Sequence, residues 1–203
     1  MGGLNGQLFD WINKWPEAWN PFLKFFSVAL SQGWVKIGFA FMIVAMLWRN
    51  ERTRKAVLLA LVAIGIANTM TNVAKEAYQG NRPFQDLGYV SEPTEFTLQN
   101  QDKVFLRVGH SDSRGTASAH SANMAALAFT MCFYLRWWGL PWALVALLTG
   151  ISRIYTGAHY PYQVGLGWLC GIFAALVVIK TWEAFVRLRG GVQWEADDVP
   201  ELP

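Results

Sequence analysis

The long apolar runs of the chain restrict its fold more than any other feature. The run from Ala56 to about Ala77 is long enough to cross a bilayer, which takes about 20 apolar residues in an α-helix. With 53% hydrophobic residues, 11 Trp and 13 Phe, the composition is too apolar and aromatic for an ordinary soluble domain of 203 residues. We therefore predict one all-α membrane domain over residues 1–190, a polytopic helix bundle.

Breaks between the apolar runs divide this domain into about five spans, with a short interfacial helix to about Leu30 before them. The predicted spans are Gly33 to Trp48, Ala56 to Ala77, Ser118 to Trp137, Leu140 to Tyr155 and Tyr162 to Phe185. The stretch from Met1 to Asn20 is too polar for a signal peptide and too short to span. Its tryptophans favour an amphipathic helix on the membrane surface. The acidic segment 191–203 is predicted to be a disordered tail.

Positive charge in the short connections predicts the orientation. Basic residues collect on one side of the membrane after successive crossings: Arg49, Arg52, Arg54, Lys55, Arg136, Arg187 and Arg189. By the positive-inside rule this side is cytoplasmic. We expect an integral protein of a bacterial inner membrane, with the opposite face toward the periplasm or the outside.

Three polar clusters fall on that opposite face, each where a predicted span meets water. They are Lys75 to Pro83, Ala117 to His120, and Ser152 to Gln163. A charged side chain such as Arg153 costs a few kcal/mol at membrane depth, so its default interpretation is a functional site. In the first cluster, the proline is expected to end the helix and leave Arg82 on extended backbone.

The clusters carry the patterns Lys-x6-Arg-Pro, Ser-x-His and Ser-Arg-x5-His-x3-Gln. In this order and spacing they resemble the three signature motifs of the type 2 phosphatidic acid phosphatase (PAP2) family. The resemblance runs from about Lys75 to Gln163, nearly half of the chain. It implies a membrane lipid phosphatase that works through a phosphohistidine intermediate.

The residue types fit phosphate chemistry by themselves. Lys75, Arg82 and Arg153 supply three positive charges for a phosphate dianion and for the charge that develops on its oxygens. Ser118 offers a hydroxyl, and a helix that begins there would point the amides of Ala119 and His120 at the same anion. The alternative for the cations is simple anchoring at the interface.

Two histidines remain for the covalent steps, and the residues alone leave their roles open because imidazole can be nucleophile or acid. The resemblance implies that His159 is the nucleophile and His120 the general acid. It also implies that Gln163 orients His159, in place of the family's usual Asp. A similar Gln stands there in the glucose-6-phosphatase and dolichyl diphosphatase branches. Ala117 and Ala119 replace the usual Pro and Gly of the second motif.

Other sequence features restrict the possible binding partners and cofactors. The net charge of +3 is small and scattered, which argues against nucleic acid. Cys132 and Cys170 lie in apolar runs and are expected to be small buried hydrophobes. No ligand-spaced cluster lies near the motifs, so we expect no metal and no other cofactor. His110 matches no motif, and Phe84 to Thr116 is predicted to be an ordered loop or lid without helical period.

Alternatives from other classes explain less. A non-catalytic scaffold does not account for the cations and histidines on one face, and a transporter would call for paired half-chains that are absent. Vanadate haloperoxidases share the motifs but are soluble. A lipid phosphotransferase or a sugar phosphatase stays open, because the motifs serve only the first half-reaction. We predict a metal-independent phosphatase of a phospholipid or polyprenyl (di)phosphate that enters sideways from the bilayer.

Overall fold

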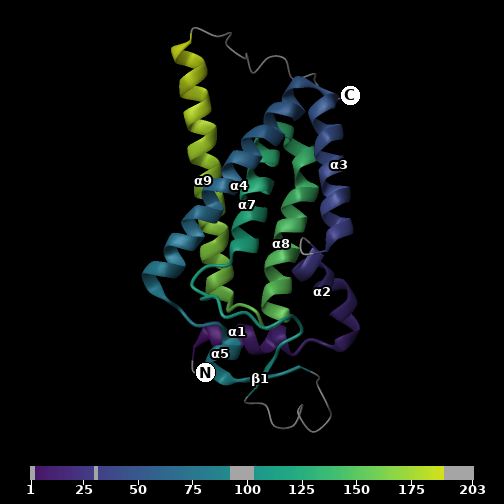
Figure 1. The fold of residues 1–203 in the computed structure, drawn as a ribbon, viewed down its shortest axis with the longest axis vertical. Helices are drawn as coiled ribbons and strands as arrows, with labels where there is room; N and C mark the ends of the chain where they lie inside the picture. The colour runs from purple at the N-terminus through teal and green to yellow at the C-terminus, as the bar shows by residue number, and fades with distance from the viewer. Residues whose placement is uncertain (1–2, 30–31, 92–102, 190–203) are drawn as a thin grey trace.

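Five helices run along the long axis of the molecule (Figure 1). They are α3 (Gly33–Arg49), α4 (Glu51–Tyr78), α7 (Ala119–Leu135), α8 (Leu140–Tyr155) and α9 (Pro161–Leu188). This computed structural model describes residues 3–29, 32–91 and 103–189. The predicted acidic tail lies outside the described residues.

Shorter elements gather at one end of the bundle, which is the lower end in Figure 1. They are α1 (Leu4–Asn13), η1 (Glu17–Trp19), α2 (Asn20–Val28), α5 (Pro83–Leu87), β1 (Tyr89–Val90) and β2 (Val104–Phe105). The two strands pair in parallel, with Tyr89 opposite Val104. At the other end, η3 (Arg136–Gly139) joins α7 to α8.

Three helical stretches of the described residues are long and apolar enough to cross a membrane: Glu51–Leu87, Ala119–Tyr155 and Pro161–Leu188. The pair Glu17–Val28 and Gly33–Arg49, bent by 61°, makes a fourth if it is one broken span. The second stretch contains α7 and α8, which pack side by side (Figure 1). The all-α membrane fold is thus borne out, with three to four candidate spans.

The helix boundaries follow local sequence signals. Ser118 is the N-cap of α7, as predicted, and α8 has the predicted bounds. At the end of α4, Gln79 takes a left-handed conformation with φ 45°, and Arg82 is extended, as expected before a proline. The basic segment after α3 was predicted as a turn, but most of it forms the first turns of α4. Asn50 alone separates the two helices, and its side chain accepts the Thr53 amide at 2.8 Å.

Small residues bring α9 against α7, and this contact positions the polar clusters. A Cβ at Gly167 would lie 2.5 Å from the Ser118 carbonyl, and one at Gly171 would lie 2.2 Å from that of Ala122. Because no side chain fits there, the two helices approach closely. The second and third clusters therefore meet at the same end.

Helix α1 packs beneath that end with one face. Phe9 and Ile12 are buried against the ends of α8 and α9, whereas Trp11 and Leu4 are exposed. The buried Asn13 side chain donates to the carbonyls of Phe105 and Tyr155 and accepts the Phe105 amide. The predicted amphipathic helix is present, but its inner face contacts protein.

In the described part of the predicted loop from Phe84 to Thr116, α5 is a helix that the sequence pattern did not predict. Arg82 is the N-cap of α5, and Pro83 stands at its first position, where a missing N–H costs nothing. The Gln85 side chain accepts the Arg82 amide at 2.8 Å. The short helix fixes the backbone of Arg82 at the edge of the polar end.

Candidate active site

The corner between α8 and α9 places His159. The Arg153 carbonyl accepts the amides of Ala158 and His159, both at 3.1 Å, and Gly157 turns the chain with φ 74°. A Cβ at Gly157 would lie 2.5 Å from the Phe105 carbonyl, so only glycine fits this turn. The His159 side chain is buried, at 2% exposure.

Gln163 fixes the tautomer of His159. Its Oε1 lies 3.1 Å from His159 Nδ1 and accepts the Tyr160 amide at 3.1 Å, while its Nε2 donates to the Asn81 carbonyl at 2.7 Å and to the Tyr162 hydroxyl. A flipped amide would set oxygen against the Asn81 carbonyl and nitrogen against an N–H, so the orientation is determined. His159 Nδ1 therefore carries the proton, and the lone pair is on Nε2.

Arg82 reaches the site from the start of α5. Its Nε donates to the Ser113 carbonyl at 2.8 Å and an Nη to the Ser113 hydroxyl at 2.6 Å. Gly115 makes room for it, because a Cβ there would lie 2.7 Å from Arg82 Cγ and 2.9 Å from Gln163 Nε2. The first and third clusters thus meet at Gly115.

Arg153 is held from the opposite side by α2. One Nη donates to the Ser27 hydroxyl at 2.8 Å and to the Ser27 carbonyl at 3.1 Å. The Arg153 Nε is buried without any hydrogen-bond partner among the described residues. A buried unsatisfied donor on a cation is rare, and a bound ligand is one ordinary explanation.

The second cluster joins the site through its backbone. The Ser118 amide donates to the Gln163 carbonyl at 2.9 Å, and its hydroxyl accepts from the Ser121 hydroxyl at 2.9 Å. Ser118 caps α7, so the amides of Ala119 and His120 lie in the first turn, where a helix has no acceptors of its own. The sequence predicted this helix start.

The three cations act on both histidines. Burial, followed by the positive charges of Arg153 and Arg82, holds the pKa of His159 well below its ordinary value of 6.5, although its bond to Gln163 opposes this shift. Lys75 also contributes to the lowering. The same three cations are the charges that act on His120. His159 is therefore neutral at pH 7.

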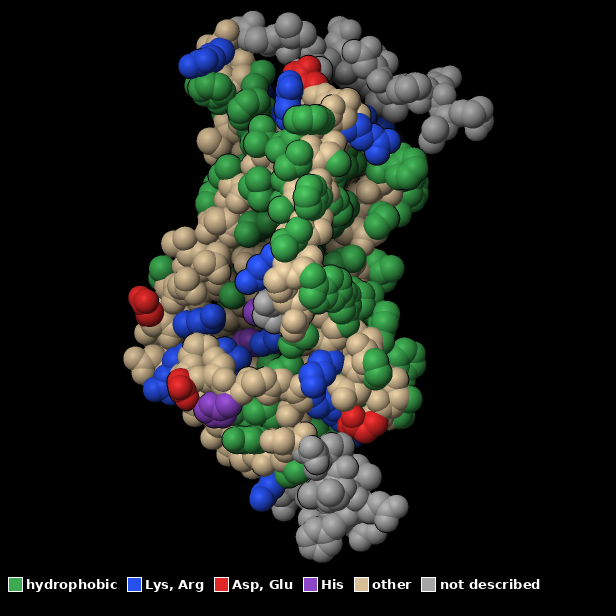
Figure 2. Space-filling model, turned by 45° about the vertical axis from the view of Figure 1, so that its right-hand side comes forward, with side chains coloured by type: hydrophobic (Ala, Val, Ile, Leu, Met, Phe, Trp, Pro, Cys, Tyr) green, Lys and Arg blue, Asp and Glu red, His purple; other side chains and the backbone are tan. Residues whose placement is uncertain are grey.

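No carboxylate balances these cations within the described ranges. The ion pairs there involve Arg107, His110, Lys180 and Arg187, and none includes Lys75, Arg82 or Arg153. Figure 2 shows Lys, Arg and His side chains around a recess in the lower half, below a largely hydrophobic upper half. The arrangement suits a dianion that can accept several hydrogen bonds.

The described residues contain no group of three or more His, Cys, Asp or Glu side chains that could hold a metal ion. Cys132 and Cys170 are free. His110 lies in the loop, as expected. Its ring packs 5.0 Å from that of Phe84, and its Nδ1 is 3.5 Å from Asp112.

The sequence did not predict the residues that anchor the predicted site side chains by hydrogen bonds. Ser27 anchors Arg153, and Asn81 anchors Gln163. Asp86 accepts hydrogen bonds from Asn81 and from the Tyr160 hydroxyl. Burial and this carboxylate raise the pKa of Tyr160, which stays protonated as the donor. Asn81 and Asp86 flank the Arg-Pro pair, and that position was their only signal.

Comparisons with known proteins identify the family of the chain. Residues 56–187 match the family model described as the PAP2 superfamily. The chain is 27% identical over 181 residues to the bacitracin transport permease protein BcrC of Bacillus licheniformis, covering 88% of this chain and 80% of that protein. It is 26% identical over 180 residues to the undecaprenyl-diphosphatase of Sulfolobus acidocaldarius, covering 88% and 78%.

A solved structure has the same fold. The transmembrane PAP2-type phosphatidylglycerolphosphate phosphatase of Bacillus subtilis superposes with a TM-score of 0.64 at 20% identity. The match covers 91% of this chain and 87% of that one. At this identity the likeness concerns the fold alone.

Proposed function

Because this chain belongs to the PAP2 superfamily, we propose that it hydrolyses a polyprenyl diphosphate through a phosphohistidine, on the extracytoplasmic face of the membrane. One observation carries the proposal: Lys75, Arg82 and Arg153 surround two histidines without a carboxylate partner in the described part of the chain. The undecaprenyl-diphosphatase relative supports the choice of a polyprenyl diphosphate. A phosphatidylglycerolphosphate is the second substrate to test, given the solved structure with this fold.

In the first step, His159 Nε2 attacks the terminal phosphorus. A P–N bond forms as the bond from phosphorus to the bridging oxygen breaks, and His120 donates its proton to that oxygen. The arginines hold the equatorial oxygens in pairs, while Lys75 acts as a point charge. The amides of Ala119 and His120 offer donors to the same oxygens.

In the second step, water attacks the phosphohistidine. His120, now neutral, takes a proton from the water, the P–N bond breaks, and inorganic phosphate leaves. Throughout, Gln163 Oε1 accepts a hydrogen bond from the Nδ1–H of His159 and keeps Nε2 toward phosphorus. A neutral amide orients the ring but does not stabilise its positive charge as a carboxylate would.

The membrane arrangement that fits this chemistry has five crossings, by α3, α4, α7, α8 and α9. Cysteines at two exposed positions test it: Asp112→Cys near the site and Arg54→Cys at the basic end. In a background without the two native cysteines, an impermeant thiol reagent should label only residue 112 in intact cells. Labelling of residue 54 instead would invert the orientation.

Phosphate release in detergent tests the activity itself. We expect release from undecaprenyl diphosphate at a higher kcat/KM than from phosphatidylglycerolphosphate, with His159→Ala as the inactive control. Activity should persist in EDTA and be blocked by vanadate, since the site supplies its positive charge from side chains. Loss of activity in EDTA with rescue by Mg²⁺ would contradict the mechanism, and release from neither lipid would contradict the function.

A further inference from the structure

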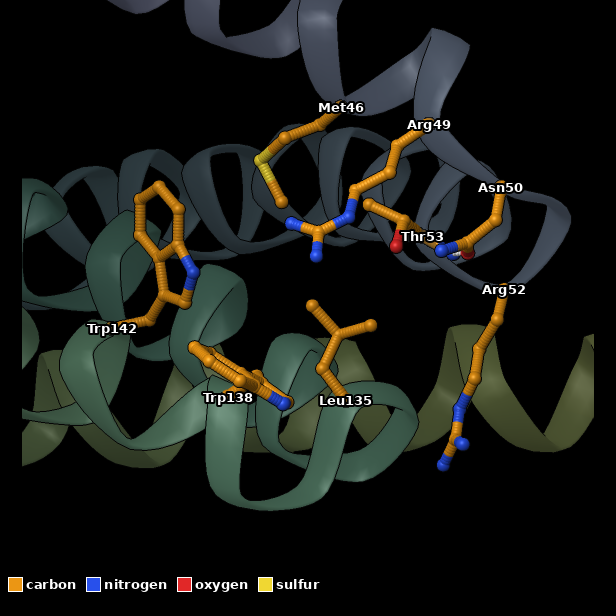
Figure 3. A pocket seen from close by; sticks show the side chains of 8 residues that line it. All are labelled: Met46, Arg49, Asn50, Arg52, Thr53, Leu135, Trp138 and Trp142. Carbon is orange, nitrogen blue, oxygen red and sulfur yellow. Dashed lines mark hydrogen bonds between the residues drawn. The ribbon is translucent and has the colours of Figure 1, made fainter. Parts of the chain in front are cut away.

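A second cationic cavity lies at the opposite end of the bundle, where α3, α4, α7 and α8 meet. It has a volume of about 400 Å³, within the usual range of ligand pockets. Its main walls are Met46, Arg49, Arg52, Leu135, Trp138 and Trp142 (Figure 3). The start of α4 at Glu51 is about 36 Å from Lys75 along the helix, at about 1.5 Å per residue. This cavity is therefore separate from the catalytic cluster.

The two arginines of the cavity differ in their hydrogen bonding. Arg52 donates from Nε to the Tyr134 carbonyl, which ties α4 to the end of α7. Arg49 has no hydrogen bond or ion pair among the described residues, and its guanidinium points into the centre of the cavity (Figure 3). Its five donors are thus available to a ligand.

The backbone adds to the positive potential. Asn50 caps α4 and takes the Thr53 amide, which leaves the amides of Glu51 and Arg52 without a helical acceptor. An anion beside Arg49 would therefore also lie next to the positive end of the α4 dipole. Phosphate, with several acceptor oxygens, matches paired arginine donors best.

The other walls indicate what the phosphate is attached to. Met46, Leu135 and the two tryptophan rings form apolar walls, which a free phosphate ion could not use. Trp138 is 80% exposed and stands at the end of a predicted span, the level at which tryptophans meet lipid headgroups. We propose that this cavity binds the phosphodiester group of an anionic phospholipid, with the glycerol backbone against the tryptophans.

Native mass spectrometry of the full chain in a neutral detergent tests the proposal, with dioctanoyl phosphatidylglycerol and dioctanoyl phosphatidylcholine as probes. Neither is a phosphate monoester or diphosphate, so the result does not depend on the proposed function. We expect the anionic lipid to bind more tightly, and Arg49→Gln to weaken it about fivefold or more.

Two neighbouring variants are matched controls. Arg54→Gln removes the same charge from an exposed position outside the cavity. In a neutral detergent no anionic surface is present, so the charge of Arg54 should not affect lipid binding. Trp138→Ala removes a wall, while Trp137→Ala removes an equally exposed neighbour that does not line the cavity. We expect Arg49→Gln and Trp138→Ala to weaken binding and the two controls to leave it within about twofold.

Each contrary outcome overturns the proposal. Equal losses in Arg49→Gln and Arg54→Gln would mean unspecific attraction. Equal binding of both lipids, which carry the same phosphodiester anion, would mean that the net negative charge of an anionic phospholipid is not recognised. Inorganic phosphate is the third probe. If inorganic phosphate binds wild type as tightly as phosphatidylglycerol does and loses this affinity in Arg49→Gln, the apolar walls contribute nothing and the ligand is a free phosphate. Unchanged melting temperatures of the variants exclude misfolding as the cause.

Discussion

Arg107 and Arg153 are both buried near the same corner of the molecule, at 6% and 7% exposure, but their surroundings differ. Arg107 has its donors occupied. Its Nε and one Nη donate to Glu17 at 3.0 and 2.6 Å, and the other Nη donates to the carbonyls of Asn13 and Tyr155. Its guanidinium also lies 4.2 Å from the Tyr155 ring centre. Within the described residues, the Arg153 side chain donates hydrogen bonds to Ser27 alone and has an unpartnered Nε.

The difference separates a structural cation from one that we propose binds an anion. A buried charge is tolerated when it is paired and hydrogen-bonded, and Arg107 meets this condition within the protein. Arg153 repels Arg82 and Lys75 and meets the condition only when an anion joins the cluster. Burial alone therefore does not identify a functional arginine, whereas incomplete pairing among like charges does.

The largest effect on activity should come from His159, the proposed nucleophile, which follows Arg153 in the third cluster. His159→Ala should lower kcat by about 10⁴-fold or more, because no other group forms the covalent intermediate. Trapping with labelled substrate should find no phosphoryl group on this variant. His120→Ala should still become phosphorylated by a substrate whose leaving group takes no proton. A phosphoryl group on residue 120 in the wild type would reverse the two roles.

The comparison itself is tested by neutral substitutions of the two arginines. Arg153→Met should lower kcat/KM by about 10²- to 10³-fold, as loss of a donor to developing charge does, with little change in stability. Arg107→Met should cost about 1–3 kcal/mol of unfolding free energy, because the buried Asn13 carbonyl loses the hydrogen bond from Arg107 and the Tyr155 carbonyl keeps the one from the Asn13 side chain. Activity assays and denaturant unfolding on both variants are needed. If Arg107→Met loses catalysis at full stability, the distinction fails.

Gln163 comes next in expected effect. Gln163→Leu leaves the His159 ring donor unpaired at a cost of about 1–3 kcal/mol, or about 5- to 100-fold in rate. Gln163→Asp should retain activity because a carboxylate also accepts the Nδ1 proton. A direct phosphate-release assay distinguishes the two. Wild-type turnover by Gln163→Leu would make Gln163 a packing residue.

The sequence predicted those parts of the site that obey local rules. The Ser118 cap follows from capping preference, and the extended Arg82 follows from the proline after it. The helix after that proline was missed, although Pro at the first helical position is itself a signal. The basic segment after α3 was predicted as a turn, because the capping role of Asn50 was not recognised.

Partners distant in sequence could not be predicted. Ser27 is 126 residues from Arg153, Asn81 is 82 from Gln163, and Glu17 is 90 from Arg107. The contacts of Ser27 and Glu17 depend on how η1 and α2 fold back under the bundle, and the contact of Asn81 depends on how the end of α4 meets α9; no local pattern specifies either. For the same reason, no sequence pattern gave Arg107 a role, whereas the third motif made Arg153 a candidate.

Two loop glycines, Gly115 and Gly109, differ in their distance from the site and should therefore differ in their effect on activity. A Cβ at Gly115 would lie 2.7 Å from Arg82 Cγ, 2.9 Å from Gln163 Nε2 and 3.1 Å from the Asn81 carbonyl, whereas one at Gly109 has nothing within 4 Å. Gly115→Ala should therefore displace Arg82 and Gln163 and lower kcat/KM about tenfold, as small misplacements in active sites do. Gly109→Ala is the matched control and should be unchanged. Equal activity of both variants would mean that the loop adapts without moving the site.

The smallest effect is a shift in the pH profile, and its sign follows from the charges around His159. Burial, Arg153 and Arg82 lower the pKa of His159 below 6.5, so its neutral, nucleophilic form should persist at pH 6.5 in the free enzyme. The acid limb of kcat/KM should therefore lie below pH 6.5.

Arg82→Gln removes one of these positive charges, which raises the pKa of His159 and moves the acid limb of the variant to higher pH. Arg114→Gln is the control, because Arg114 is exposed, donates to Asn81 and is not among the charges that act on His159. Measuring all three proteins on one substrate removes the ionisation of the substrate phosphate from the comparison. A limb that stays in place in Arg82→Gln, or moves equally in Arg114→Gln, would mean that the cations around His159 bind the substrate without tuning the nucleophile.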